Sequence, residues 1–333
     1  MMSVSVVIPC YNARKTIGPL VSSIKIQTGF STHDEIIVVD DRSTDDSAHI
    51  AEEKGGNIIT MPENSGPAAA RNTGVEHARN DIILFLDADT LLEPGSLEKI
   101  KRFFEEHPDA ACVNGRCSMT PILSSPARDY KALVEYDWHE ELLRKNPELT
   151  CFNARIGAIK KDIFMEIGGF DSRFRGAEVE DFEFSYRLIK KYKIHFLSDV
   201  QVRHLFPNFI GTVKDYWSRA GKWAELFLSR GKFDGGGTTA ANGFGHIVGS
   251  LIPILALISP AYKAGPVLLL ISLIIFLWVF RMFFFLVFME KGGGALLTAI
   301  SLHVIYSCII ASSASIGLIQ SASRKLILRE KQS

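Results

Sequence analysis

The sequence predicts an α/β domain followed by an α-helical membrane domain. Over residues 4–89, short apolar runs alternate with helix-like segments, which is typical of a parallel sheet with helices on both faces. Charge is distributed unevenly, because residues 247–320 carry only four charged side chains. Apolar stretches of this length suit a lipid bilayer, so we expect the last third of the chain to lie in a membrane.

The composition gives no reason to expect a nucleic-acid partner or a cysteine-based site. Lysine plus arginine and aspartate plus glutamate both number 37, so the formal net charge is zero. No basic block is long enough to suggest nucleic-acid binding. The five cysteines are odd in number and include no CxxC pair. A disulfide framework or a structural zinc site is therefore not expected.

Acidic residues fall at the ends of two expected strands. The expected strands are 4–9, 35–41, 57–61 and 81–89, and the expected helices between them are 16–27, 43–55 and 66–79. Ligands of parallel sheets bind at the carboxyl ends of strands. Asp40 and Asp41 lie at one such end, and Asp87 and Asp89 lie at another. Because a buried carboxylate needs a partner, we expect a cation or a ligand at this edge.

Six motifs give the α/β domain a family resemblance. They are, in order, VVIPCYNA (6–13), EIIVVDDRSTDDS (35–47), NSGPAAARNTG (64–74), LFLDADT (84–90), GGFDSRF (168–174) and VEDFEFSYRL (179–188). Each motif is common by itself, but the six in this order and spacing form a specific pattern. The sequence resembles the family-2 inverting glycosyltransferases over roughly residues 3–205. The resemblance implies a glycosyltransferase-A fold.

The resemblance implies a divalent metal, Mn²⁺ or Mg²⁺, held by the DAD motif. It implies that Asp89 ligates the metal, and that Asp87 contacts the ribose or reaches the metal through water. Ala88 lies between them, among the residues implied to bind the nucleotide sugar. His204 is a further candidate ligand, since some relatives place a histidine here and imidazole suits Mn²⁺. The alternatives are a pair of turn or cap aspartates and a structural histidine.

Other residues are implied to bind the nucleotide. Pro9 and Tyr11 match the wall of the nucleotide pocket, and Asp41 matches a residue that accepts a hydrogen bond from the base. Arg71 is implied to point its guanidinium towards the diphosphate. Two alternatives stay open: Asp41 caps the helix that begins after Ser43, and Arg71 forms a surface ion pair.

The Glu180–Asp181 pair matches the acidic motif that supplies the general base. Transfer to a hydroxyl requires removal of its proton, and a carboxylate within hydrogen-bond reach can accept it. In the family the aspartate of this pair has that role, which implies Asp181 as the base with Glu180 beside it. The alternative is an acidic helix start. No QxxRW motif follows, and RAGKW (219–223) resembles it only weakly. This counts against a processive polysaccharide synthase.

The chain beyond the catalytic domain (1–205) is expected to contact the membrane throughout. Residues 206–240 are expected to form a linker and an amphipathic interfacial helix, in which aromatic residues face one side and basic residues the other. Packing on the soluble core is the alternative. The membrane region 241–323 contains three apolar segments, at about 247–262, 267–289 and 295–319, and a basic tail follows at 324–333. The positive-inside rule places the tail in the cytoplasm, which needs an even number of crossings, so the topology stays open.

These expectations combine into one function and one alternative. We expect a membrane-bound inverting glycosyltransferase of the cell (inner) membrane, with its catalytic domain in the cytoplasm. It would move a sugar from a UDP-, GDP- or dTDP-sugar to a hydroxyl of a lipid or lipid-linked glycan, as in synthesis of cell-envelope polysaccharides and glycolipids. The alternative is a polyprenyl-phosphate sugar transferase, whose acceptor phosphate is already ionised and needs no base.

Overall fold

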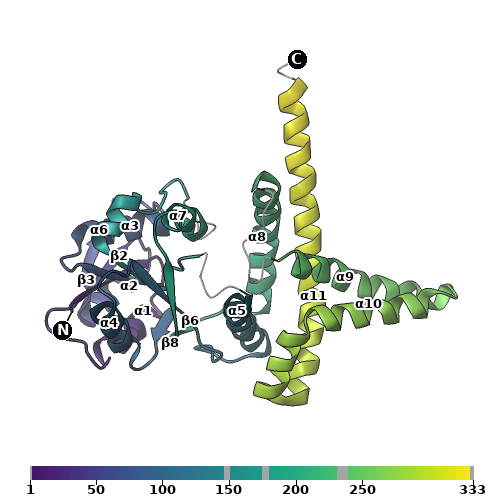
Figure 1. The fold of residues 1–333 in the computed structure, drawn as a ribbon, viewed down its shortest axis with the longest axis horizontal. Helices are drawn as coiled ribbons and strands as arrows, with labels where there is room; N and C mark the ends of the chain where they lie inside the picture. The colour runs from purple at the N-terminus through teal and green to yellow at the C-terminus, as the bar shows by residue number, and fades with distance from the viewer. Residues whose placement is uncertain (1, 146–150, 175–179, 231–238, 331–333) are drawn as a thin grey trace. The chain divides into compact units, whose positions relative to one another are not determined.

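The chain folds into two compact units. The computed structural model describes residues 2–145, 151–174, 180–230 and 239–330 (Figure 1). The first unit comprises Met1–Ile122 and Leu142–Leu205, and the second comprises Leu123–Glu141 and Phe206–Ser333.

The sequence places residues 123–141 in the catalytic domain, but in the structure they belong to the second unit. Three predicted features extend beyond the described residues. They are the linker at 231–238, position 179 of the last motif and positions 331–333 of the tail.

The described residues of the first unit form one mixed sheet of eight strands. The strand order is β3-β2-β1-β4-β7-β6-β8-β5. The strands are β1 Val4–Cys10, β2 Glu35–Asp40, β3 Asn57–Thr60, β4 Ile82–Leu86, β5 Thr90–Leu92, β6 Cys112–Cys117, β7 Ile156–Lys160 and β8 Ile194–His204. The helices of this unit are α1 Ile17–Lys25, α2 Ser47–Glu53, α3 Pro67–His77, α4 Ser96–Glu106, α6 Lys161–Ile167 and α7 Glu180–Leu188.

The predicted parallel arrangement is confirmed for β3, β2, β1 and β4, and the sheet continues beyond them with β7. Strand β7 runs antiparallel to β4, with Leu86 opposite Ile156. Because β7 begins beside the carboxyl end of β4, it can only run back along it. Strand β8 is parallel to β6, and the short β5 is antiparallel to β8. The parallel pairing of β1 with β2 and β4 brings their carboxyl ends to one edge of the sheet.

A glycine allows α3 to pack closely on the sheet. A Cβ at Gly74 would lie 2.3 Å from Cγ1 of Val7 in β1 and 3.2 Å from Cγ2 of Val39 in β2. Only glycine fits a helix this close to buried strands. Gly66, just before α3, has φ +88°, which also favours glycine. These two positions bring the start of α3 against the edge where β1 and β2 end.

Two element boundaries differ by more than two residues from those predicted. Strand β4 ends at Leu86 rather than residue 89, because the chain turns there and the Thr90 N–H donates to the Asp87 carbonyl (3.1 Å). The helix expected from residue 43 begins at Ser47, whose N–H donates to Asp45 Oδ1 (3.1 Å). In both cases a local side chain or turn competes successfully with the periodic pattern.

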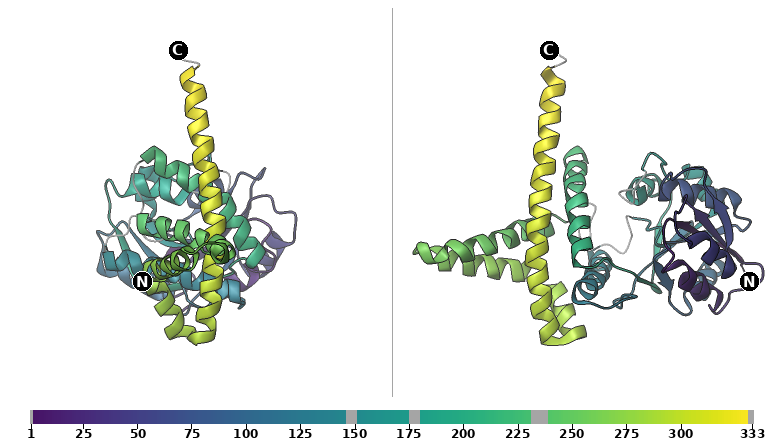
Figure 2. Two further views of the ribbon diagram at one scale, coloured as in Figure 1. Left: turned by 90° about the vertical axis from the view of Figure 1, so that its right-hand side faces the viewer. Right: turned by 180° about the vertical axis from the view of Figure 1, so that it is seen from behind.

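The second unit is helical. Its helices are α5 Pro126–Lys145, α8 Phe209–Arg230, α9 Ala240–Ile258, the 3₁₀ turn η1 Ser259–Ala261, α10 Gly265–Val279 and α11 Arg281–Glu330. Gly292 breaks α11 with a φ of 79°. Figures 1 and 2 show α9 beside α10 and α8 beside α11. A Cβ at Gly221 in α8 would lie 3.7 Å from Gly317 Cα in α11, so these two helices pack backbone to backbone there.

Two stretches of the described residues are long and apolar enough to cross a membrane, Ala240–Ala261 and Arg281–Ser321. The predicted segment 267–289 is not one helix. Helix α10 ends at Val279, and α11 begins at Arg281. Phe280, at the turn, is buried against the ring of His303, with the ring centroids 4.0 Å apart. Packing of this residue therefore fixes a bend that the apolar pattern does not reveal.

Helix α5 joins the helical unit although it lies between β6 and β7 in the sequence. The Tyr130 hydroxyl contacts His303 Nδ1 in α11 at 2.9 Å. Lys131 Nζ lies 4.7 Å from the ring centroid of Tyr216 in α8 and 3.2 Å from Glu135. All five side chains are at least partly buried, and each makes a polar contact with another of the five. These polar contacts hold α5 to the helices around it.

Candidate active site

The carboxyl ends of β1 and β2 hold the residues predicted to bind the nucleotide. Pro9 is half-buried in β1, and Tyr11, just beyond the strand, is 52% exposed. Asp41 is buried, and its two carboxylate oxygens accept the N–H groups of Ser65 and Gly66, each at 2.8 Å. Asp41 therefore holds the entrance of α3, and the alternative that it caps the helix after Ser43 is wrong.

A buried arginine connects the end of β4 to the start of α7. Arg71 Nη2 donates to Asp87 Oδ1 at 2.8 Å, and Nη1 donates to Glu180 Oε1 at 3.2 Å. Arg71 is 4% exposed. Burial by itself lowers the pKa of Arg71, but the surrounding carboxylates, Asp87 first, raise it above its ordinary value. Arg71 is thus a charged, buried bridge between two carboxylates, not the surface ion pair of the alternative.

The turn after β4 brings Asp89 to His204. Strands β5 and β8 pair Thr90 with His204, and the Leu205 N–H donates to the Asp89 carbonyl (2.9 Å). This places His204 Nε2 3.1 Å from Asp89 Oδ2, with the histidine buried and the aspartate side chain 46% exposed. Burial acts to raise the pKa of Asp89, but His204 and then Arg155 hold it below its ordinary value. Ala88, partly exposed, forms the tip of the turn.

Asp181 lies next to this bridge with one carboxylate oxygen unused. Its Oδ2 accepts the Ala154 N–H at 3.1 Å, while its buried Oδ1 has no hydrogen-bond partner among the described residues. Burial raises the pKa of Asp181 from 3.8 to about 7, Arg71 opposes the rise, and Glu180 adds to it. A carboxylate with a pKa near 7 is suited to accept a proton at neutral pH.

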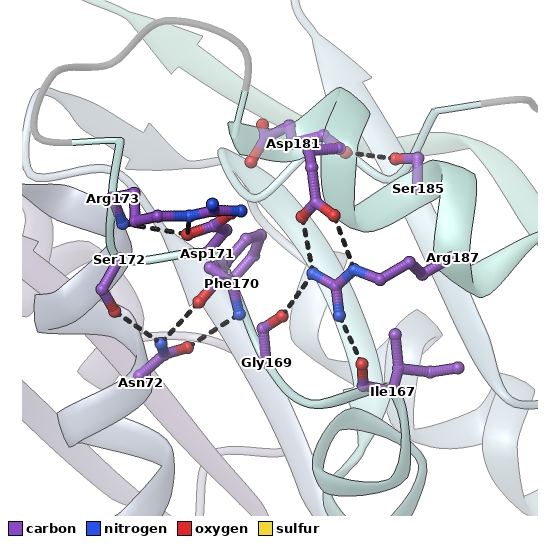
Figure 3. A network of polar contacts seen from close by, with 11 residues as sticks. Asn72, Ile167, Gly169, Phe170, Asp171, Ser172, Arg173, Asp181, Ser185 and Arg187 are labelled. Atoms are coloured by element: carbon purple, nitrogen blue, oxygen red, sulfur yellow. Dashed lines mark hydrogen bonds and ion pairs between the residues drawn. The ribbon is translucent and has the colours of Figure 1, made fainter.

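The last two sequence motifs position α7. Asn72 in α3 clamps the backbone of Phe170, donating to its carbonyl at 2.8 Å and accepting its N–H at 2.9 Å (Figure 3). Arg187 donates to the carbonyls of Ile167 and Gly169, and Ser185 donates to the carbonyl of Asp181 (Figure 3). The contacts of Arg187 hold the last turn of α7 against the loop that follows α6, and those of Asn72 hold the same loop against α3.

Arg155 also belongs to the site, although it lies outside the six sequence motifs. Its Nε lies 3.6 Å from Asp87 Oδ2, and its Nη1 donates to Cys117 Sγ at 3.3 Å. It stands just before β7 in a segment without a recognised motif. The available signal was that Arg155 is the only charged residue between positions 151 and 159.

The residues present fit a divalent cation whose coordination shell is completed by oxygens of the substrate. Four carboxylates, of Asp87, Asp89, Glu180 and Asp181, face two guanidiniums, which leaves a charge of about −2 if all are ionised. Among the described residues, no group of three or more His, Cys, Asp or Glu side chains forms a metal cage. One carboxylate and an adjacent imidazole, with phosphate oxygens completing the shell, is the kind of donor set that Mg²⁺ or Mn²⁺ accepts.

Comparison with known families gives the domain its name. Residues 5–168 match the model of the family described as glycosyl transferase family 2. The chain carries a family-2 glycosyltransferase domain. The matched residues include the DAD turn and β7. The Glu180–Asp181 pair at the start of α7 lies beyond them in the sequence.

Two bacterial glycosyltransferases are among its relatives. The domain is 34% identical over 167 residues to the poly(ribitol-phosphate) beta-N-acetylglucosaminyltransferase TarS of Staphylococcus aureus, covering 47% of this chain and 26% of TarS. It is 37% identical over 158 residues to the putative teichuronic acid biosynthesis glycosyltransferase TuaG of Bacillus subtilis, covering 46% of this chain and 61% of TuaG. The chain covers less than two thirds of the length of either protein.

A solved structure shares the fold. It is the mannosyltransferase PcManGT from Pyrobaculum calidifontis, in complex with GDP-Man and Mn²⁺. The likeness has a TM-score of 0.55 at 19% sequence identity and covers 97% of this chain and 86% of that one. It shows a glycosyltransferase-A fold for the family-2 glycosyltransferase domain. The roles assigned above to individual site residues stay predictions.

The raised pKa of Asp181 predicts how stability changes with pH. Between pH 4 and 7 the folded chain keeps a proton that the unfolded chain releases, so this group's stabilisation is present below pH 3.8 and is lost as the pH rises through about 7. The Asp181→Asn variant should lose less stability than the wild type between pH 5 and 8, by more than about 1 kcal/mol. Melting temperatures of the detergent-solubilised proteins would show it.

Asp199→Asn is the matched control, because the Asp199 side chain is 62% exposed and pairs with Lys99 at the surface. That variant should follow the wild-type profile. If Asp181→Asn followed it as well, the carboxyl would not be protonated at neutral pH in the fold.

Proposed function

We propose that this protein is a metal-dependent, membrane-bound inverting glycosyltransferase. It moves a sugar from a nucleotide-diphosphate sugar to a hydroxyl of a lipid or lipid-linked glycan. The observation that carries the proposal is Asp181, whose free carboxylate oxygen and pKa near 7 are those of a general base. A binding protein of the same fold has no need for such a group.

The donor is held along the carboxyl edge of the parallel strands. Pro9, Tyr11 and Asp41 lie where β1 and β2 end, and Asp87 and Ala88 follow β4, the other neighbour of β1. The nucleoside lies against the residues that follow β1 and β2, and the diphosphate reaches the residues that follow β4. The donor is a UDP-, GDP- or dTDP-sugar. The solved structure of PcManGT, which shares this fold, contains bound GDP-Man.

Asp89 and His204 would hold Mn²⁺ or Mg²⁺. When bound, the ion neutralises the charge that develops on the departing diphosphate. The orientation of Asp87 and the ionisation of Asp89 do not depend on the ion. Arg71 keeps the Asp87 carboxylate oriented, and the Asp89 carboxylate is kept ionised by His204 and Arg155.

The transfer step needs one proton acceptor. The acceptor oxygen attacks the anomeric carbon from the face opposite the diphosphate. The new C–O bond forms as the bond to the phosphate oxygen breaks, and the configuration is inverted. The hydroxyl proton passes to Asp181 Oδ1, which is buried and unpaired among the described residues. The Ala154 N–H on Oδ2 keeps the carboxylate facing the same way throughout.

The apolar helices support an acceptor in the membrane. Exposed large apolar side chains cover α9, α10 and α11, and include Ile247, Leu257, Leu270, Trp278 and Ile319. Helices of this kind anchor a protein in a bilayer. Soluble nucleotide sugars are supplied in the cytoplasm, so the proposed location is the inner membrane with the catalytic domain on the cytoplasmic side. The relation to TarS and TuaG favours a cell-envelope glycan as the acceptor.

Removing the base should separate transfer from binding. In Asp181→Asn the amide keeps the size of the carboxyl but cannot accept the proton, so transfer should fall by about 100-fold or more. Affinity for the nucleoside diphosphate should change by less than about threefold, because the proposed contact of Asp181 is with the acceptor hydroxyl and not with the nucleotide. Radiolabelled sugar transfer to membrane extracts and calorimetry with UDP and GDP measure the two quantities, with Asp199→Asn as the matched control.

The acceptor class decides between the proposal and its alternative. Near-wild-type transfer by Asp181→Asn would contradict the base. So would a purified protein that glycosylates polyprenyl phosphate and no hydroxyl acceptor, because a phosphate monoester needs no base. Either result would favour the polyprenyl-phosphate sugar transferase.

Metal dependence is tested at Asp89. Binding of UDP or GDP should require Mn²⁺ or Mg²⁺, and Asp89→Ala should bind the nucleotide with and without metal equally weakly, at least about tenfold below the metal-loaded wild type. His204→Ala should lie between the two. Calorimetric titration measures all three. Equal affinity of the wild type with and without metal would remove the metal from the proposal.

A further inference from the structure

Two guanidiniums lie at the carboxylate cluster, and they differ in what they can reach. Arg71 is 4% exposed, and each of its Nη atoms already donates to a carboxylate. The Arg155 side chain is 19% exposed and lies next to Asp87, whose side chain is 25% exposed. A ligand that enters beside the DAD turn can contact Arg155, whereas Arg71 is covered.

Arg155 contacts Asp87 only weakly. Its Nε lies 3.6 Å from Asp87 Oδ2, which is too long for a hydrogen bond, although the two charges attract. Asp87 Oδ1 is held by Arg71 at 2.8 Å, so the orientation of Asp87 does not depend on Arg155. Arg155 also acts on Asp89, whose carboxylate it helps to keep ionised. Its charge is therefore directed at both aspartates of the turn.

The backbone around Arg155 is fixed from both sides. The Arg155 N–H donates to Asn153 Oδ1 at 3.0 Å, and the Asn153 carbonyl accepts from buried Asn114 at 2.9 Å. The Ala154 N–H donates to Asp181. One three-residue segment therefore carries the guanidinium beside the DAD turn and the N–H that orients the proposed base. A side chain on such a segment is preorganised for a ligand.

We infer that Arg155, rather than Arg71, contacts the diphosphate of the sugar donor. The inference rests on the proposed function, because it assigns one more residue to the same site. A diphosphate next to four carboxylates needs a cation beyond the metal, and the planar fork of arginine donates two hydrogen bonds to phosphate oxygens. As the bond between the anomeric carbon and the phosphate oxygen breaks, the electron pair stays on that oxygen. Arg155 stabilises this charge on the leaving group.

The test separates the phosphates from the nucleoside. Calorimetry with Mn²⁺ present compares UDP and GDP with uridine and guanosine for the wild type, Arg155→Ala and Arg155→Lys. Of UDP and GDP, the one that the wild type binds more tightly should bind Arg155→Ala about 10- to 100-fold more weakly. This is the range for a lost hydrogen bond to a charged group. The nucleosides should bind as they do to the wild type. Arg155→Lys, which keeps the charge without the fork, should lose less than Arg155→Ala.

An arginine away from the site controls for the loss of charge. Arg102→Ala removes an arginine that is 58% exposed and pairs with Glu98 on α4, and it should bind diphosphates like the wild type. Melting temperatures show whether each variant is folded. If Arg155→Ala does not fold, Arg155→Lys decides, since a lysine with wild-type affinity for UDP and GDP would overturn the inference.

Two other outcomes are distinguishable. Arg155→Ala with unchanged affinity for diphosphates, or with equal loss for nucleosides, would also overturn the inference while leaving the proposed function intact. A wild-type protein that binds no nucleoside diphosphate with any metal would contradict the proposed function itself.

Discussion

The buried Arg71 bridge is the interaction on which the rest of the site depends. It ties the end of β4 to the start of α7 through Asp87 and Glu180, residues that lie far apart in the sequence. Breaking a buried ion pair by removing one partner leaves an uncompensated charge, which is strongly destabilising. The bridge therefore holds two acidic side chains close together, in a place where two carboxylates would otherwise repel each other.

The bridge also sets the electrostatic environment of Asp181. Burial and the carboxylates of Glu180 and Asp87 raise its pKa, and the Arg71 guanidinium limits the rise, so the carboxyl titrates near 7. Removing the arginine would raise this pKa further, and more positive charge nearby would lower it. The hydrogen bonds of Asn72 and Arg187 also hold Phe170 and Gly169, in the segment that follows α6, against α3 and α7.

The sequence predicts the parts of this site that are local. The carboxyl ends of buried strands correctly locate Asp41, Asp87 and Asp89, because the apolar runs before them are unambiguous. The motif order also identifies the family and the fold. It does not show that Arg71 reaches Glu180, 109 positions away, because only the folded chain brings these residues together. The sequence does not show the direction of β7 either, because a short apolar run looks the same in a parallel and in an antiparallel strand.

The helical unit shows the same limit. Low charge predicts that the last third of the chain is apolar, but the bend at Phe280 depends on its packing against His303. The assignment of α5 to this unit depends on Tyr130 and Lys131, two polar residues in a helix that the predicted domain boundary at residue 205 places with the sheet. Contacts between distant segments, rather than propensity, decide these features.

The pH dependence of sugar transfer tests most directly whether the Arg71 network tunes Asp181 as a base. The account predicts that kcat/KM, measured with the purified protein at saturating metal, falls tenfold per pH unit on the acid side of an apparent pKa near 7. A rate that stays constant from pH 5 to 8 would contradict it, because the proton acceptor would then be ionised throughout and could not be the buried carboxyl of Asp181.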